Sequence, residues 1–99
     1  MDGLTAQELK RASKRVSVAI PSRIVLAGMK SSAVTIRDLS FHGCLAEGDA
    51  AVEAGSYVSV DLPRIGLVRA RVAWKRQHTL GLNFLAPVDV RKCVNLQRA

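Results

Sequence analysis

The chain has few of the residues that build stacking surfaces, disulfide frameworks or metal sites. Only four of its 99 residues are aromatic, and only two are cysteines. Cys44 and Cys93 lie far apart and belong to no Cys-x-x-Cys pair or histidine cluster, so we expect no disulfide framework and no metal site. Two free thiols are typical of a reducing compartment, and we expect the protein in the cytoplasm.

Long apolar runs and enzyme motifs are also missing. No run approaches the ~20 apolar residues of a membrane span, and residues 1–5 lack the charged and apolar regions of a secretory signal. The sequence shows no nucleophile–base pair, no group of metal ligands and no phosphate-binding loop. We therefore expect neither an enzyme nor a cofactor.

Charge is distributed unevenly along the chain. Fifteen Lys and Arg against eight Asp and Glu give a net charge of +7. Residues 10–37 contain seven basic residues and no acid, whereas residues 38–61 contain five acids and no base. A second basic cluster is formed by Arg64, Arg69, Arg71, Lys75 and Arg76. The pattern favours an anionic partner, such as nucleic acid, a nucleotide, an acidic lipid surface or an acidic protein, although a solvated surface explains any single charge equally well.

Apolar residues alternate with polar ones in several short segments, which predicts strands. The predicted strands are residues 16–27, interrupted by Pro21 at a bulge or an edge, and residues 33–39, 44–46, 56–62, 68–75 and 80–84. Pro87 and the apolar stripe after it predict a helix over residues 87–98. At 48% apolar residues the chain can bury one core, and short strands with tight turns favour an all-β, six-stranded antiparallel barrel with a C-terminal helix.

The run Asp38-Leu39-Ser40-Phe41-His42-Gly43 follows a predicted strand. Its simplest interpretation is a turn, because Asp and Ser side chains bond nearby amides and Gly accepts a positive φ. The alternative is a ligand site. A carboxylate and a hydroxyl beside a glycine could accept N–H groups, such as those of a guanine edge, while the glycine lets the ligand approach the backbone. The motif alone leaves both interpretations open.

A basic run precedes it, in which Arg11 and Arg15 are four residues apart. We expect residues 1–15 to form a flexible arm. On such an arm the two arginines could grip a ligand from two directions, because a guanidinium pairs with phosphate or with the O6/N7 edge of guanine and stacks on bases. By itself an Arg-x-x-x-Arg pair is a weak signal.

In this order the motifs resemble the PilZ domain, a bacterial receptor for the second messenger cyclic di-GMP. The resemblance extends from Lys10 to about Phe84. It depends on Arg11-x-x-x-Arg15, a strand containing Pro21, Asp38-x-Ser40-x-x-Gly43, Leu62-Pro63, Val72-Ala73-Trp74 and Gly81-Leu82-Asn83-Phe84. It implies a PilZ-type barrel over residues 16–86 and an N-terminal arm that closes over cyclic di-GMP. The helix predicted from the apolar stripe then completes the chain, over residues 87–99.

The resemblance also implies roles for individual residues. The ligand would be bound by Arg11 and Arg15 from the arm, and by Asp38, Ser40 and Gly43 on the barrel. Lys10 stands where the family varies between one bound ligand and an intercalated pair, so the stoichiometry is open.

Two further positions belong to the candidate ligand site. We expect His42 to be a turn residue that could also contact ligand. The alternation places Trp74 in the core with Val68, Ala70 and Val72, although its edge could instead reach the ligand face.

Three functions are compatible with these features. The first is a cyclic di-GMP receptor that acts through ordering of its arm and through a downstream protein partner. The second is a PilZ-like adaptor that binds proteins but no ligand, which the intact motifs argue against. The third is a small basic barrel that binds nucleic acid, which the scarcity of aromatic residues argues against.

Overall fold

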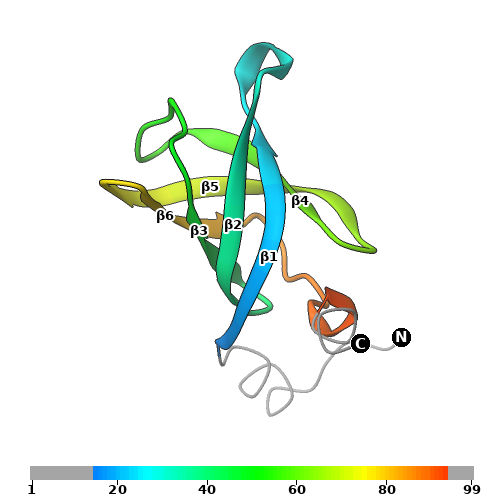
Figure 1. Ribbon diagram of the computed structural model, residues 1–99. Helices are drawn as coiled ribbons and strands as arrows, with labels where there is room; N and C mark the ends of the chain where they lie inside the picture. Colours follow the sequence, from blue (N-terminus) through cyan, green and yellow to red (C-terminus); the bar gives the residue numbers. More distant parts are fainter. Residues whose placement is uncertain (1–14, 94–99) are drawn as a thin grey trace.

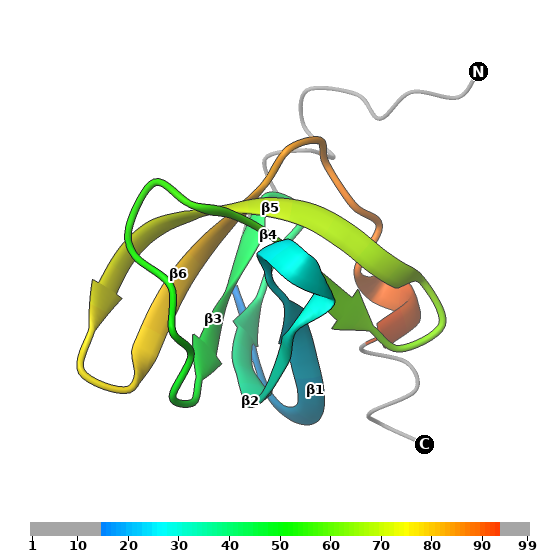
Figure 2. The same ribbon diagram turned by 90° about the horizontal axis from the view of Figure 1, so that it is seen from above.

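The computed structural model describes residues 15–93 and shows a closed barrel of six antiparallel strands (Figure 1, Figure 2). Around the barrel the strands follow the order β1-β2-β3-β6-β5-β4, and β1 closes it against β4. The elements are β1 (Val16–Val25), the 3-10 turn η1 (Ala27–Met29), β2 (Ser31–Leu39), β3 (Gly43–Glu47), β4 (Tyr57–Leu62), β5 (Gly66–Arg76) and β6 (Thr79–Phe84). The predicted fold class is confirmed.

Alternating side chains fill the barrel. In β4, for example, Val58, Val60 and Leu62 are buried, while the residues between them face outward or sit at the surface. The same period of two holds in much of the other strands, because successive side chains point to opposite faces of a sheet, but bulges interrupt it. The completely buried core residues include Ile24, Ile36, Leu39, Val60, Val72 and Leu80.

Pro21 lies inside one continuous strand, β1, rather than between two. It stands opposite Thr35 of β2, and β1 pairs with β4 on its other side only at Ile24 and Val25. The proline, which has no N–H to donate, therefore occupies a stretch of β1 with one unpaired edge, as its chemistry requires.

Register shifts interrupt the alternation at three places, one of which corrects the prediction for Trp74. In the β5–β6 pair, Val72 stands opposite Leu82, but Trp74 stands opposite Gly81, so one residue of β5 is extra. Such a bulge changes the face on which the following residues lie. Trp74 is therefore 39% exposed on the outer surface instead of buried in the core.

The C-terminal helix begins later than predicted. Val88 donates its N–H to the carbonyl of Phe41 (2.8 Å), which ties this segment to the barrel. Helical structure starts at Arg91, whose N–H is capped by the Asp89 carboxylate (3.1 Å). Cys93 is buried and its thiol donates to the Pro63 carbonyl. The helix thus packs on the lower end of the barrel, opposite the η1 hairpin tip (Figure 1).

Two predicted segments lie outside the described residues: the arm up to residue 14 and the rest of the helix after residue 93. Among the helices that the structure describes, none is long and apolar enough to cross a membrane.

Candidate functional site

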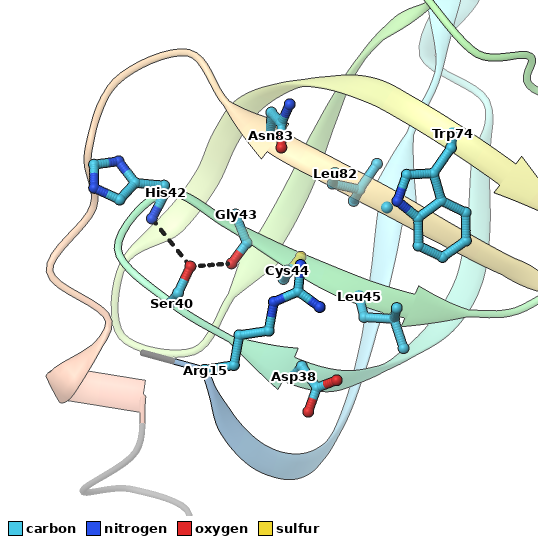
Figure 3. A pocket seen from close by; sticks show the side chains of 11 residues that line it. Arg15, Asp38, Ser40, His42, Gly43, Cys44, Leu45, Trp74, Leu82 and Asn83 are labelled. Atoms are coloured by element: carbon cyan, nitrogen blue, oxygen red, sulfur yellow. Dashed lines mark hydrogen bonds between the residues drawn. The ribbon is translucent and has the colours of Figure 1, made fainter. Parts of the chain in front are cut away.

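A hollow of about 240 Å³ lies on the outside of the barrel, over β2, β3, β6 and β5 (Figure 3). It brings together charged, polar and aromatic side chains from segments that are distant in the sequence. The lining residues are Arg15, Asp38, Ser40, His42, Gly43, Cys44, Leu45, Trp74, Gly81, Leu82 and Asn83.

Most of the residues predicted for the ligand site meet in this hollow. Arg15, Asp38, Ser40, His42, Gly43 and Trp74 all line it. The other two, Lys10 and Arg11, lie outside the described residues. The structure thus joins the Asp-x-Ser-x-x-Gly motif, the second motif arginine and the single tryptophan.

Strand register explains why these side chains meet. Asp38 of β2 stands opposite Leu45 of β3, Leu45 stands opposite Gly81 of β6, and Gly81 stands opposite Trp74 of β5. Partners in adjacent strands share a face of the sheet. The four residues therefore form one row across the outer surface, with a carboxylate at one end and an indole at the other.

Gly81 has no side chain, and this leaves the space that sets the orientation of Trp74. A Cβ on Gly81 would lie 2.2 Å from the indole nitrogen of Trp74, so the indole packs directly on the Gly81 backbone. The Arg76 guanidinium lies 5.9 Å from the centre of the indole ring, within range of a cation–π contact. Trp74 is thus held flat against β6, with part of its surface open to solvent.

The Ser40 side chain holds the turn between β2 and β3. Its hydroxyl donates to the Gly43 carbonyl (3.2 Å) and accepts from the His42 N–H (3.3 Å), and the Ser40 N–H donates to the same carbonyl (2.9 Å). Ser40 is the one polar residue among the described residues that is buried. The turn and the ligand-site interpretations of the motif are therefore compatible, because the turn that Ser40 holds also forms one wall of the hollow.

The same turn is fixed to the end of β6. The His42 carbonyl accepts from the Phe84 N–H (2.8 Å), while the exposed His42 ring points away from the other labelled side chains (Figure 3). This bond makes the turn a rigid extension of the barrel. His42 is placed at the rim of the hollow rather than inside it.

Gly43 is required for a reason that the sequence did not reveal. A Cβ at this position would lie 2.1 Å from the carbonyl oxygen of Leu82 on β6. No real side chain is accommodated at that distance, so Gly43 permits the close approach of β3 and β6. The glycine serves the barrel whether or not a ligand also approaches it.

Two charged groups face the hollow without a partner among residues 15–93. Among the described residues, the Asp38 carboxylate and the Arg15 guanidinium make no hydrogen bond and no ion pair. Asp38 is half-buried and Arg15 is exposed. An acceptor and a fork of five donors are thus available to an outside molecule.

The thiol of Cys44 lies beneath the hollow and does not supply a nucleophile. Burial, with a smaller effect of the neighbouring Cys93, raises the pKa of the Cys44 thiol to about 12. It stays protonated at neutral pH, whereas the nucleophilic and metal-binding form is the thiolate. Within residues 15–93, no group of three or more His, Cys, Asp or Glu side chains could hold a metal ion.

Sequence reasoning missed several participants, among them Leu45, Gly81, Asn83 and Arg76. Leu45 and Asn83 line the hollow, and Arg76 stacks on Trp74. Asn83 stands on the outward side of a predicted strand, so alternation could have suggested it. The contact of Arg76 with the Trp74 ring depends on the bulge before Trp74, and the sequence carries no clear signal for that bulge.

Comparison with known proteins agrees with this architecture. Compared with curated proteins, the chain gives no match. The family model of the PilZ domain, a family known to bind cyclic di-GMP, matches residues 9–99, nearly the full length. That match and the closed six-stranded barrel establish that the chain belongs to the PilZ domain family.

Proposed function

We propose that this chain binds cyclic di-GMP in the hollow and relays the signal to another protein. The observation that carries the proposal is the row across the barrel. It places the Asp38 carboxylate, which has no partner in the described part of the chain, and the exposed Trp74 indole on one surface, with the Arg15 side chain beside them. The family is one of binding and signalling domains rather than enzymes.

The groups around the hollow complement the chemistry of this ligand, which has two phosphate charges and two guanines. Asp38 can accept from the N1–H and N2–H of one guanine. Arg15 can donate to a guanine O6/N7 edge or to phosphate, and Trp74 offers a surface on which a base can stack. Ser40 would act mainly by keeping the turn in shape.

The arm completes the site in this proposal. Arg11 would provide a second guanidinium, and the arm would become ordered over the ligand. Lys10 supplies charge but no planar group for stacking, and the titration below measures whether one ligand or a stacked pair is bound. The proposal places the protein in the cytoplasm of a bacterium, where this messenger acts.

Calorimetric titration with cyclic di-GMP at physiological salt tests the proposal. A bidentate arginine–guanine contact contributes about 1–3 kcal/mol, so Arg15→Ala should weaken binding by about tenfold to a hundredfold. Lys30→Ala is the matched control, because it removes one exposed positive charge beside η1, outside the lining of the hollow. GMP should bind far more weakly than cyclic di-GMP.

The same titration separates the alternatives. No binding of the dinucleotide by the unaltered chain would favour an adaptor that binds only proteins. Tight, strongly salt-dependent binding of long polynucleotides would favour a nucleic-acid-binding barrel. Equal affinities of the Arg15→Ala and Lys30→Ala variants would contradict the site proposed here.

A further inference from the structure

A second outward-facing surface of the barrel carries arginines among exposed apolar side chains. It consists of Leu67, Arg69 and Arg71 on β5, Tyr57 on β4 and Leu85 directly after β6, and is called the β5 face below. The three β5 residues alternate with Val68, Ala70 and Val72, which point inward. Tyr57 is 57% exposed, and Leu67 and Leu85 are each 54% exposed.

Strand pairing makes these residues neighbours. Arg71 stands opposite Tyr57, and the Leu85 N–H donates to the Arg69 carbonyl (3.1 Å). The β5 face is therefore one continuous patch in which two guanidinium groups lie among three large apolar side chains.

The charges of the β5 face are not neutralised by the described part of the chain. Arg69 stands opposite Ser59, and Arg71 stands opposite Tyr57 and Asn83, so no acid stands directly across from either arginine. The nearest acid in register, Asp61, stands opposite Leu67 and diagonally from Arg69. The acid of β4, Asp61, forms its ion pair with Arg23 at 3.3 Å. Among residues 15–93, neither arginine makes an ion pair.

From this composition we infer that the β5 face docks an acidic, amphipathic segment of a partner protein. Arginine forms paired hydrogen bonds with a carboxylate, and Tyr and Arg are among the residues that contribute most at protein interfaces. Exposed Leu67 and Leu85 would meet apolar side chains of that segment. Nucleic-acid interfaces are more polar than this patch.

The β5 face is physically continuous with the hollow. Asn83 lines the hollow and stands opposite Arg71. The Phe84 N–H donates a hydrogen bond to the His42 carbonyl, and the N–H of the next residue, Leu85, donates to the Arg69 carbonyl. The hollow thus borders the end of β6, next to the part of the docking surface that Leu85 forms. The docking inference goes beyond the proposed function and does not require it.

Amide chemical-shift titration of the full chain tests the inference with defined probes. The main probe is a 16-residue amphipathic peptide with leucines at spacings of three and four and glutamates elsewhere. A matched peptide carries glutamine in place of each glutamate. A 20-nucleotide oligouridine and vesicles of phosphatidylglycerol with phosphatidylcholine represent the other anionic partners.

The account expects saturable shifts at Leu67, Arg69, Arg71 and Leu85 with the glutamate peptide, and at least tenfold weaker binding of the glutamine peptide. The double variant Arg69→Glu/Arg71→Glu should bind the glutamate peptide at least tenfold more weakly. The control Lys30→Glu/Arg64→Glu makes the same change of charge elsewhere and should alter binding by twofold or less. Circular dichroism of each variant checks that the barrel is folded.

Three outcomes would overturn the inference. One is the absence of shifts at the β5 face with the glutamate peptide. Another is an equal loss of binding in both double variants, which would indicate attraction by net charge alone. The third is tighter binding of the oligonucleotide or the vesicles than of the peptide at these residues. Repeating the titration with cyclic di-GMP separates the two proposals. If the chain binds the peptide but does not respond to the dinucleotide, the receptor proposal fails and the docking inference stands.

Discussion

The indole of Trp74 lies directly against the backbone of Gly81, across the β5–β6 pair. Any side chain at position 81 would occupy the space of the indole ring. The bulge in β5 turns Trp74 outward, and the glycine lets the ring lie flat. The two residues together make the aromatic wall of the hollow.

Trp74→Ala should weaken cyclic di-GMP binding with little effect on the fold. Stacking of a base on an aromatic ring contributes about 1–3 kcal/mol, so the dissociation constant should rise by about tenfold or more. The indole is 39% exposed and packs on Gly81, so the thermal unfolding midpoint should also fall, but the inner core that holds the barrel is untouched. Calorimetry and thermal unfolding of the same samples measure both. Unchanged affinity would exclude stacking on Trp74.

Gly81→Ala should act through Trp74. The new methyl group displaces the indole, so its fluorescence should shift toward the spectrum of a solvated tryptophan, and ligand affinity should fall as in Trp74→Ala. Because Trp74 is the only tryptophan, emission spectra of the folded variant report this change directly. An emission spectrum identical to that of the unaltered chain would contradict the packing described here.

Much of the fold could be predicted, because alternation of apolar residues directly reflects which side of a strand is buried. Val58, Val60 and Leu62 show this in β4. The error at Trp74 arose from a bulge, which depends on the pairing of β5 with β6 and leaves no mark in β5 alone. The late start of the helix likewise depends on a long-range bond, from Val88 to Phe41.

Only some residues of the candidate site could be predicted, and its arrangement could not. Motif spacing identified Asp38, Ser40 and Gly43, yet the contact of Gly43 with Leu82 needs the β3–β6 pairing. Leu45 was not predicted as a site residue, because an isolated leucine in a short strand carries no functional signal. The roles of Lys10 and Arg11 remain predictions, since both lie outside the described residues.

Gly43→Ala should destabilise the barrel even without ligand. Forcing extra atoms into a packed site typically costs about 1–3 kcal/mol, and here the obstacle is the Leu82 carbonyl at 2.1 Å. Urea unfolding measures the change. Gly28→Asn is a suitable control, because its surroundings are open and asparagine tolerates its positive φ. Equal stability of the Gly43→Ala variant and the unaltered chain would contradict this account of the glycine.

Ser40→Ala should loosen the β2–β3 turn. The change removes the bond to the Gly43 carbonyl and leaves the His42 N–H without its acceptor, for which about 1–3 kcal/mol of unfolding free energy is expected. Ser59→Ala, on the outer side of β4, should change it by less than about 0.5 kcal/mol. Urea unfolding compares the two, and a Ser40 effect as small as that of Ser59 would show that the hydroxyl does not hold the turn.

The Cys44 thiol should be unreactive in the folded protein, and stability should fall at high pH. Its pKa rises from 9.0 to about 12 because burial disfavours the thiolate. Above pH 9 the unfolded chain therefore loses a proton that the folded chain keeps, so this contribution to stability is present below pH 9 and declines as the pH rises toward 12.

Iodoacetamide labelling at pH 8, read by mass spectrometry, checks the reactivity of this thiol. Urea unfolding between pH 8 and 11 checks the linkage, with Cys44→Ala as the control that should lose less stability over this range. Rapid labelling of Cys44 under native conditions, or an equally steep pH dependence in the Cys44→Ala variant, would contradict the burial argument.

The central claim is that cyclic di-GMP binds in the hollow between Asp38 and Trp74. Titration of the isotope-labelled full chain with this dinucleotide, followed by amide and indole chemical shifts, tests it most directly. The account predicts the largest shifts at Asp38, Leu45, Gly81 and the Trp74 indole N–H. An absence of saturable shifts would contradict the claim. So would a response centred on the separate groove lined by Lys30, Glu53 and Tyr57.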